Sequence, residues 1–297
     1  MKNLDELINK AKAKGLRKIV VAAADDLQVL QAIQQGIESN IISPLLVGQK
    51  STIISIASQI GLDLKSIYIE DEADPFVASK KAVQLIKESK GEIIMKGMVG
   101  TAPFLKAILN KENGLKYSGL LSHLALCECD FYHKVIGITD VAINIAPTFN
   151  DKINILKNSL IAYNKLGYTN PKVAIICPVE VVNEKIESTV HASMLTLMNM
   201  RNQLTDCIID GPLALDVAIS KEAAKHKGIS GEVAGDADLL LVPELNSGNI
   251  LYKSFIIAAR AKTAAIVLGT QIPIVLTSRS DSDTSKLLSI AFAALID

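Results

Sequence analysis

A serine and an arginine near the end of the chain have the types and spacing that could bind a small anion. Ser278 and Arg279 lie between an apolar run at 274–276 and a segment rich in helix-capping residues at 280–283. A hydroxyl beside a guanidinium suits phosphate oxygens, because the guanidinium presents its N–H groups in a fixed fork. An ordinary capped helix with a surface arginine fits the same spacing. Taken alone, the pattern leaves both interpretations open.

A second candidate is the junction between an expected strand and an expected helix near residue 96. Lys96, Gly97, Gly100 and Thr101 follow one another there, and they could line a phosphate or pantetheine site. Ligands of α/β proteins bind beyond the carboxyl ends of the strands, where helix N-termini present free N–H groups. The segment is not a Walker A sequence, because no Gly-Lys-Ser/Thr follows.

A third junction follows the apolar run at 239–242. Gly248 permits close backbone approach just before an expected helix. Asn249 and Lys253 lie four residues apart and therefore share one helical face. The alternative is a turn glycine followed by a solvated lysine.

A fourth junction contains Asp210 and Asp216, which flank a Gly-Pro pair. The Gly-Pro pair predicts a turn. The two carboxylates could take part in chemistry or could cap a helix.

The cysteines and histidines predict neither a metal site nor a hydrolase. The four cysteines are spaced too irregularly for a disulfide framework, and their pattern favours reduced thiols in the core of a cytosolic protein. The four histidines are dispersed, and the sequence has neither a Gly-x-Ser-x-Gly elbow nor a Gly-x-Gly-x-x-Gly dinucleotide motif. The cysteines are Cys127, Cys129, Cys177 and Cys207.

Length and composition indicate an α/β protein of two domains. The chain has 297 residues, is 49% hydrophobic with no tryptophan, and has a net charge of zero, which argues against a dedicated nucleic-acid binder. The N-terminus has no apolar region of a signal peptide, and no run of about 18 apolar residues predicts a membrane span. We therefore expect a cytoplasmic protein that does not bind membranes.

Short β-branched runs alternate with helical patterns, which predicts mainly parallel, doubly wound sheets. Two runs after residue 114 are separated by turn residues and predict an antiparallel pair. The expected strands are 18–23, 44–48, 66–70, 91–96, 122–126, 135–139, 173–177, 207–210, 239–242, 265–268 and 274–276. The expected helices with clear ends are 26–39, 51–61, 75–87, 102–109, 150–166 and 282–295.

Several of these segments together resemble the phosphate acetyl/butyryltransferase family, and phosphate butyryltransferases in particular. The resemblance runs over the whole chain in the expected order. The matching stretches are 95–97 (MKG), 139–147 (TDVAINIAP), 210–216 (DGPLALD), 235–253, and 276–279 (LTSR) followed by Asp281 and Ser282.

The resemblance implies an α/β fold of two doubly wound domains with a cleft between them, an architecture like that of isocitrate and isopropylmalate dehydrogenases. The chain would cross twice, giving one domain of residues 1–117 and 268–297 and another of 118–267. It implies reversible transfer of a short acyl group, here butyryl, from acyl-CoA to phosphate, which gives acyl phosphate and coenzyme A. No cofactor or metal is implied, and a homo-oligomer is expected.

The resemblance also implies roles for individual residues. Arg279 would hold phosphate, Ser278 would stabilise the oxyanion of the tetrahedral intermediate, and a carboxylate would take the thiol proton. In the related acetyltransferases that carboxylate follows the Ser-Arg pair by several residues, and an ungapped count reaches Ser285. The carboxylates present here are Asp281, which we predict as the base, and Asp283, which we assign to substrate binding together with the two junctions around Lys96 and Asn249.

Three alternatives remain open at this point. A phosphate acetyltransferase would differ only in the size of its acyl pocket. A non-catalytic protein that binds acyl phosphate or coenzyme A would have a degraded Ser-Arg pair, yet Ser278 and Arg279 are both present. A decarboxylating dehydrogenase would need an acidic metal site and a nicotinamide site, and the sequence shows no motif for either.

Overall fold

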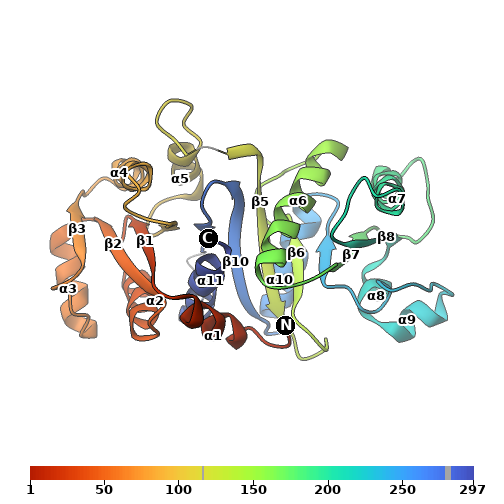
Figure 1. Ribbon diagram of the computed structural model, residues 1–297, viewed down its shortest axis with the longest axis horizontal. Helices are drawn as coiled ribbons and strands as arrows, with labels where there is room; N and C mark the ends of the chain where they lie inside the picture. The colour runs from red at the N-terminus through yellow and green to blue at the C-terminus, as the bar shows by residue number, and fades with distance from the viewer. Residues whose placement is uncertain (116, 278–281) are drawn as a thin grey trace. The chain divides into compact units, whose positions relative to one another are not determined.

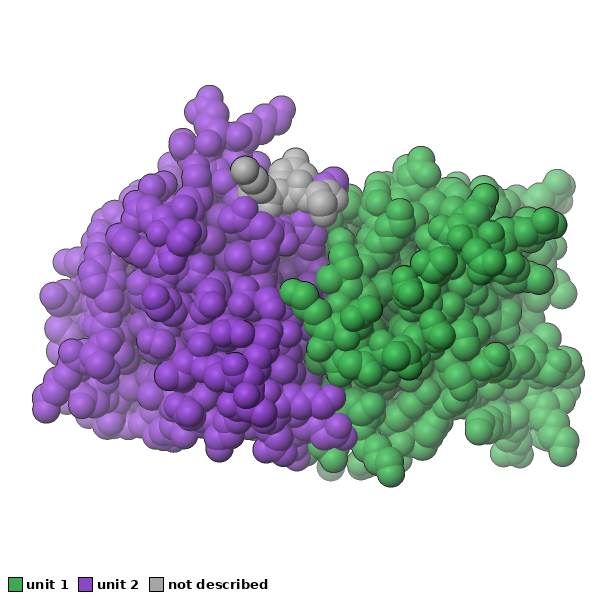
Figure 2. Space-filling view, viewed as in Figure 1, with its two compact units in different colours: residues 1–3, 120–263 green, residues 4–119, 264–297 purple. Residues whose placement is uncertain are grey.

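The computed structural model describes residues 1–115, 117–277 and 282–297. The chain divides into two compact units, coloured separately in Figure 2. Unit 1 consists of residues 1–3 and 120–263, and unit 2 of residues 4–119 and 264–297. The sequence prediction placed its two boundaries at 117/118 and 267/268.

Unit 2 has parallel strands in the order β3-β2-β1-β4-β11, followed by β10, which pairs with β11 in the antiparallel sense (Figure 1). The antiparallel β10–β11 pair differs from the parallel order that the pattern predicted. The strands are β1 (Arg17–Ala22), β2 (Ile42–Gly48), β3 (Tyr68–Asp71), β4 (Ile93–Lys96), β10 (Lys262–Thr270) and β11 (Ile274–Val275).

Some helices of unit 2 begin at residues with clear capping chemistry. Asp26 accepts a hydrogen bond from the backbone N–H of Val29, and Asp74 caps a helix whose first residue is Pro75. The predicted elements do not include α1, which packs on α11. The helices are α1 (Asp5–Lys14), α2 (Leu27–Glu38), α3 (Lys50–Ile60), α4 (Pro75–Lys87), α5 (Thr101–Ile108) and α11 (Asp283–Ile296).

Unit 1 has strands in the order β5-β6-β9-β7-β8. The predicted antiparallel pair is confirmed as β5 and β6, with Ala125 opposite Ile138, and the other pairs are parallel. The strands are β5 (Tyr117–Glu128), β6 (Ile136–Thr139), β7 (Lys172–Ile176), β8 (Ile208–Leu213) and β9 (Leu239–Leu241). The helices are α6 (Phe149–Lys165), α7 (Glu187–Met200), α8 (Leu215–Ile219), α9 (Lys221–His226) and α10 (Leu245–Ile257).

The Gly-Pro turn predicted in the stretch 210–216 is wrong. Gly211 and Pro212 belong to β8, and helix α8 begins only at Leu215. Strand β8 is at one end of the strand order of unit 1, and its pairing with β7 shifts register beside this position. An edge strand with an irregular register accommodates a proline, because no ladder hydrogen bond needs its missing N–H.

The cysteines are free and buried, which confirms the prediction of core thiols. Burial raises the pKa of the Cys127 thiol well above its ordinary value, so it stays protonated. Within the described residues, none of the helices combines the length and the apolar character that a membrane span requires.

Candidate active site

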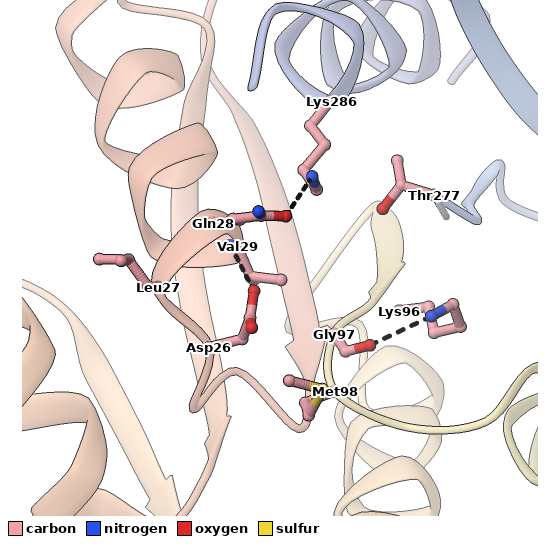
Figure 3. Close-up of a pocket in the computed structure, with 9 residues that line it drawn as sticks. All are labelled: Asp26, Leu27, Gln28, Val29, Lys96, Gly97, Met98, Thr277 and Lys286. Carbon is pink, nitrogen blue, oxygen red and sulfur yellow. Dashed lines mark hydrogen bonds between the residues drawn. The ribbon is translucent and has the colours of Figure 1, made fainter. Parts of the chain in front are cut away.

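A cavity of about 290 Å³ opens in unit 2 where β4 ends (Figure 3). Its walls come from the start of α2, the end of β4 with the following loop, the second residue after β11 and the end of the first turn of α11. The lining residues are Asp26, Leu27, Gln28, Val29, Lys96, Gly97, Met98, Thr277 and Lys286.

Lys96 brings a buried ammonium to this cavity. It is the last residue of β4 and is 6% exposed. Its Nζ donates to the carbonyl oxygens of Gly97 and Val99, both at 3.2 Å. Lys96 therefore stands at the strand end where the sequence analysis placed it, and its role in binding stays a prediction.

Gly97 lines the same cavity, and its backbone lies against the end of β1. Its N–H donates to the carbonyl of Ala22 at 2.8 Å, and the N–H of Met98 donates to the carbonyl of Ala23 at 2.7 Å. A Cβ at Gly97 would overlap the Ala23 oxygen. Glycine is therefore required for the loop after β4 to approach the end of β1.

Lys286 is a site residue that the sequence analysis missed. It lies in α11, is 2% exposed, and donates from Nζ to Oε1 of Gln28 at 3.1 Å (Figure 3). Ser289 and Ile290, three and four residues further on, are also buried, so the three side chains share the inward face of α11. A lysine on the buried face of a helix is unusual, but only the packing of α11 shows that this face is buried.

Three other predicted residues of unit 2 do not line this cavity. Gly100 is the N-cap residue of α5 and Thr101 is its first residue, and both are exposed. Asp283 is the first residue of α11, where its negative charge favours the helix N-terminus. The predicted catalytic residues Ser278, Arg279 and Asp281 lie outside the described residues.

In unit 1 the loop after β6 wraps around a buried carboxylate. Asp140 is 3% exposed and accepts hydrogen bonds from the backbone N–H groups of Ala142, Ile143 and Asn144 at 2.8–3.1 Å. The side-chain amide of Asn144 also donates to Asp140, and to the carbonyl of Leu121 at 2.8 Å. Asp140 therefore fixes the shape of this loop.

Gly248 and Asn249 hold the same loop from α10. Gly248 lies inside the first turn of α10, not before the helix as predicted, and a Cβ there would overlap the carbonyl oxygen of Asp140. The Asn249 side chain donates to the carbonyl of Val141 at 3.0 Å. Lys253, one turn further on, is exposed. The first two residues thus position the Asp140 loop.

His123, on β5, is a buried imidazole beside this loop. Its backbone carbonyl accepts from the Thr139 hydroxyl and from the N–H of Val141, both at 3.3 Å. The side chain is buried, and neither ring nitrogen has a hydrogen-bond partner within the described part of the chain. Burial lowers the pKa of His123 to about 4, although the charge of Asp140 opposes this effect. The imidazole is therefore neutral at pH 7.

The aspartates of the stretch 235–253 form an ion-pair network before β9 begins. Asp236 contacts Lys172 at 2.6 Å and Lys134 at 3.1 Å, and Asp238 contacts Lys134 at 2.7 Å. This network lies at the amino end of β9, opposite the end where the Asp140 loop and α10 meet. Its position indicates a structural role.

The carboxylates of the stretch 210–216 do not meet. Asp210 lies in β8, where burial raises its pKa. Asp216 lies in α8, accepts from the N–H of Val217 and pairs with Lys227 at 2.9 Å. The alternative that Asp216 serves a helix end agrees with these contacts. Among the residues that the structure describes, no group of three or more His, Cys, Asp or Glu side chains is placed to hold a metal ion.

The fold and these contacts define an α/β protein with a basic cavity beside the carboxyl ends of parallel strands. A family model described as phosphate acetyl/butaryl transferase matches residues 3–79 and 76–294. The chain is 44% identical to a phosphate butyryltransferase of Clostridium acetobutylicum, over 100% of this chain and 98% of that protein. It is 36% identical to a phosphate acetyltransferase of Thermotoga maritima, over 98% and 99% of the two chains.

Among solved structures, a branched-chain phosphotransacylase from Enterococcus faecalis V583 has a TM-score of 0.81 and 32% identity, with 94% of this chain and 99% of that chain covered. The chain belongs to the phosphate acetyl/butyryltransferase family and is an acyltransferase. The α/β fold class and the family predicted from the sequence are both confirmed.

Proposed function

We propose that this protein transfers a butyryl group reversibly between coenzyme A and inorganic phosphate. The observation that carries the proposal is the full-length match to a phosphate butyryltransferase at 44% identity. Relatives named phosphate acetyltransferase match over the same length at lower identity, so acetyl is the second candidate for the acyl group. One methylene in an apolar pocket changes specificity by about 1–3 kcal/mol, so neighbouring acyl chains should also react.

The proposed reaction uses the two substrates and side chains of the protein, and it needs no metal or cofactor. A phosphate oxygen attacks the thioester carbonyl, the tetrahedral intermediate collapses, and the carbon–sulfur bond breaks to release the thiolate, which takes up a proton. In the reverse direction a base removes the thiol proton and the sulfur attacks the acyl phosphate, with phosphate as the leaving group. No metal or other cofactor enters either direction, and a chelator should leave the rate unchanged.

Three residues receive chemical roles in this proposal. Arg279 binds the phosphate, Ser278 donates a hydrogen bond to the developing oxyanion, and Asp281 takes the thiol proton. These roles follow from the resemblance of the stretch 276–282 to the family. The assignment of substrate binding to Lys96 is supported by its buried ammonium in the cavity of unit 2.

Two wider expectations belong to the proposal. We expect a homo-oligomer, whose mass light scattering after gel filtration would give. We also expect a cytoplasmic enzyme, because its proposed partners are coenzyme A, acyl-CoA, phosphate and acyl phosphate.

The test is phosphate-dependent thiol release from acetyl-, propionyl-, butyryl- and isobutyryl-CoA. We expect the largest kcat/KM with butyryl-CoA. No phosphate-dependent release from any of the four would refute the acyltransferase proposal, and a largest value with acetyl-CoA would replace butyryl by acetyl.

Variants test the assigned roles. Arg279→Ala should raise KM for phosphate and lower kcat, and unchanged kinetics would remove Arg279 from the site. Asp281→Asn should lower the rate of thiolysis far more than Asp283→Asn does. Full activity in both variants would refute a carboxylate base at either position.

A further inference from the structure

The cavity in unit 2 carries an unusual concentration of positive charge. The ammonium groups of Lys96 and Lys286 both line a volume of about 290 Å³, and both side chains are more than nine-tenths buried. Among the lining residues that the structure describes, Asp26 carries a carboxylate, which accepts from the N–H of Val29. Two like charges in one small space of low dielectric repel each other, so an anion between them would be stabilising.

Lys286 owes its inward position to specific contacts. It begins the stretch of α11 whose following residues are largely buried, and the amide oxygen of Gln28 accepts its ammonium proton. This amide oxygen holds the ammonium in a defined direction. Lysine is rarely buried this deeply in proteins, and a buried lysine on the wall of a cavity suits a function in binding.

The size and the donor groups of the cavity restrict the ligand. Pockets for organic ligands usually measure about 300–1,000 Å³, so this cavity is at the lower limit. Two ammonium groups and the hydroxyl of Thr277 are hydrogen-bond donors on its walls. Donors around a small positive cavity suit an oxyanion, which accepts hydrogen bonds at every oxygen.

We propose that Lys286 is a phosphate-binding residue of the acyl transfer, that it acts with Lys96 in this cavity, and that Gln28 positions it. The phosphate is the attacking substrate in one direction and the phosphoryl end of acyl phosphate in the other. This inference rests on the proposed function. It adds a second buried cation that would bind the phosphate.

The primary test measures KM for phosphate and for butyryl-CoA separately in Lys286→Met, which keeps the length of the side chain and removes its charge. We expect KM for phosphate to rise about 10- to 100-fold, the value of hydrogen bonds to a charged group, with KM for butyryl-CoA within about twofold of wild type. Lys286→Arg should restore part of the phosphate affinity. Lys87→Met, at an exposed lysine of α4, is the matched control and should behave as wild type.

Two outcomes would overturn the inference. If KM for butyryl-CoA rises and that for phosphate does not, the cavity holds a phosphate group of coenzyme A. If neither constant changes, Lys286 binds no substrate.

Two further measurements cover the remaining cases. Should Lys286→Met fail to fold, Gln28→Leu leaves the lysine in place. It should raise KM for phosphate about threefold to tenfold with kcat little changed, because the hydrogen bond that the ammonium donates to the amide oxygen of Gln28 is lost. An unchanged KM refutes the positioning. Should the wild type show no acyl transfer, the proposed function fails. Calorimetric titration with inorganic phosphate then tests the binding site by itself. We expect wild type and Lys286→Arg to bind phosphate more tightly than Lys286→Met does. Equal affinity in all three proteins would contradict phosphate binding by Lys286.

Discussion

Replacing His123 by leucine should make the protein less sensitive to acid. The ordinary pKa of histidine is 6.5, and burial lowers that of His123 to about 4. Below pH 6.5 the imidazole of His123 therefore binds a proton in the unfolded chain, whereas in the folded protein it does so only below about pH 4. Wild type loses stability across this window, because protonation of the unfolded state is favoured. His123→Leu has no imidazole to protonate and should escape that loss.

The size of the effect follows from the pKa difference. One pKa unit is worth about 1.36 kcal/mol, so the fall from 6.5 to about 4 corresponds to about 3 kcal/mol. The variant should also gain about 1–3 kcal/mol at pH 7, because it removes two buried ring nitrogens that have no hydrogen-bond partner among the described residues. The free energy of unfolding of His123→Leu minus that of wild type should therefore be positive at pH 7 and should grow by up to about 3 kcal/mol by pH 4.

Urea unfolding of both proteins at several pH values between 7 and 4 measures this difference. Carboxylates titrate in both proteins, and their contribution cancels in the subtraction. His226→Leu, at an exposed histidine of α9, is the control and should differ from wild type by no more than about 0.5 kcal/mol at any of these pH values. A His123→Leu difference that is independent of pH, or that shrinks as the pH falls, would contradict the argument.

Three further substitutions test contacts that shape the two units. Gly97→Ala should lower the free energy of unfolding in urea by about 2 kcal/mol or more, because its Cβ has no space against the end of β1; wild-type stability would show that the loop can shift. Asn249→Ala should cost about 1–2 kcal/mol in the same assay, since the carbonyl of Val141 loses its donor. Asp236→Asn should lower stability at pH 7 through the lost pairing with Lys172. Desolvation raises the folded pKa of Asp236, but the hydrogen bonds from Lys172, Lys134 and His133 together outweigh it and lower that pKa. The loss should therefore become smaller once the pH falls below the unfolded pKa of Asp236; an equal loss at pH 7 and pH 3 would contradict this explanation.

The succession of strands and helices was predictable because local signals mark most element ends. Helix α4 has the predicted bounds, since Asp74 and Pro75 give a cap and a first-turn proline. The run of β-branched residues predicted β1, and the turn residues between β5 and β6 predicted the end of one strand and the start of the next. Prediction failed at Pro212, because a sequence does not show that a strand will lie at the end of a sheet.

The candidate site was only partly predictable, because burial depends on tertiary packing. Lys96 and Asn249 stand at junctions that α/β geometry marks as functional, and the structure places them at strand ends or against the loops that follow. Lys286 follows the stretch 276–282 by four residues and His123 lies in β5, and for both of them only packing shows that their polar groups are buried. The stretch 235–253 resembles the family, yet not every residue in it points to the site. Asp236 belongs to an ion-pair network with Lys172.

The two units use the same device with opposite charge. In each, a glycine lets a backbone segment approach the end of a parallel strand, Gly97 at β1 and Gly248 at the residue after β6, and a buried polar group lies beside it. In unit 2 that group is an ammonium, and in unit 1 it is the carboxylate of Asp140. Substituting either glycine would disturb the backbone and the site together. Lys286 differs from the two glycines, because the backbone does not depend on its side chain for a close approach. A substitution of Lys286 can therefore test the proposed phosphate binding without disturbing the backbone.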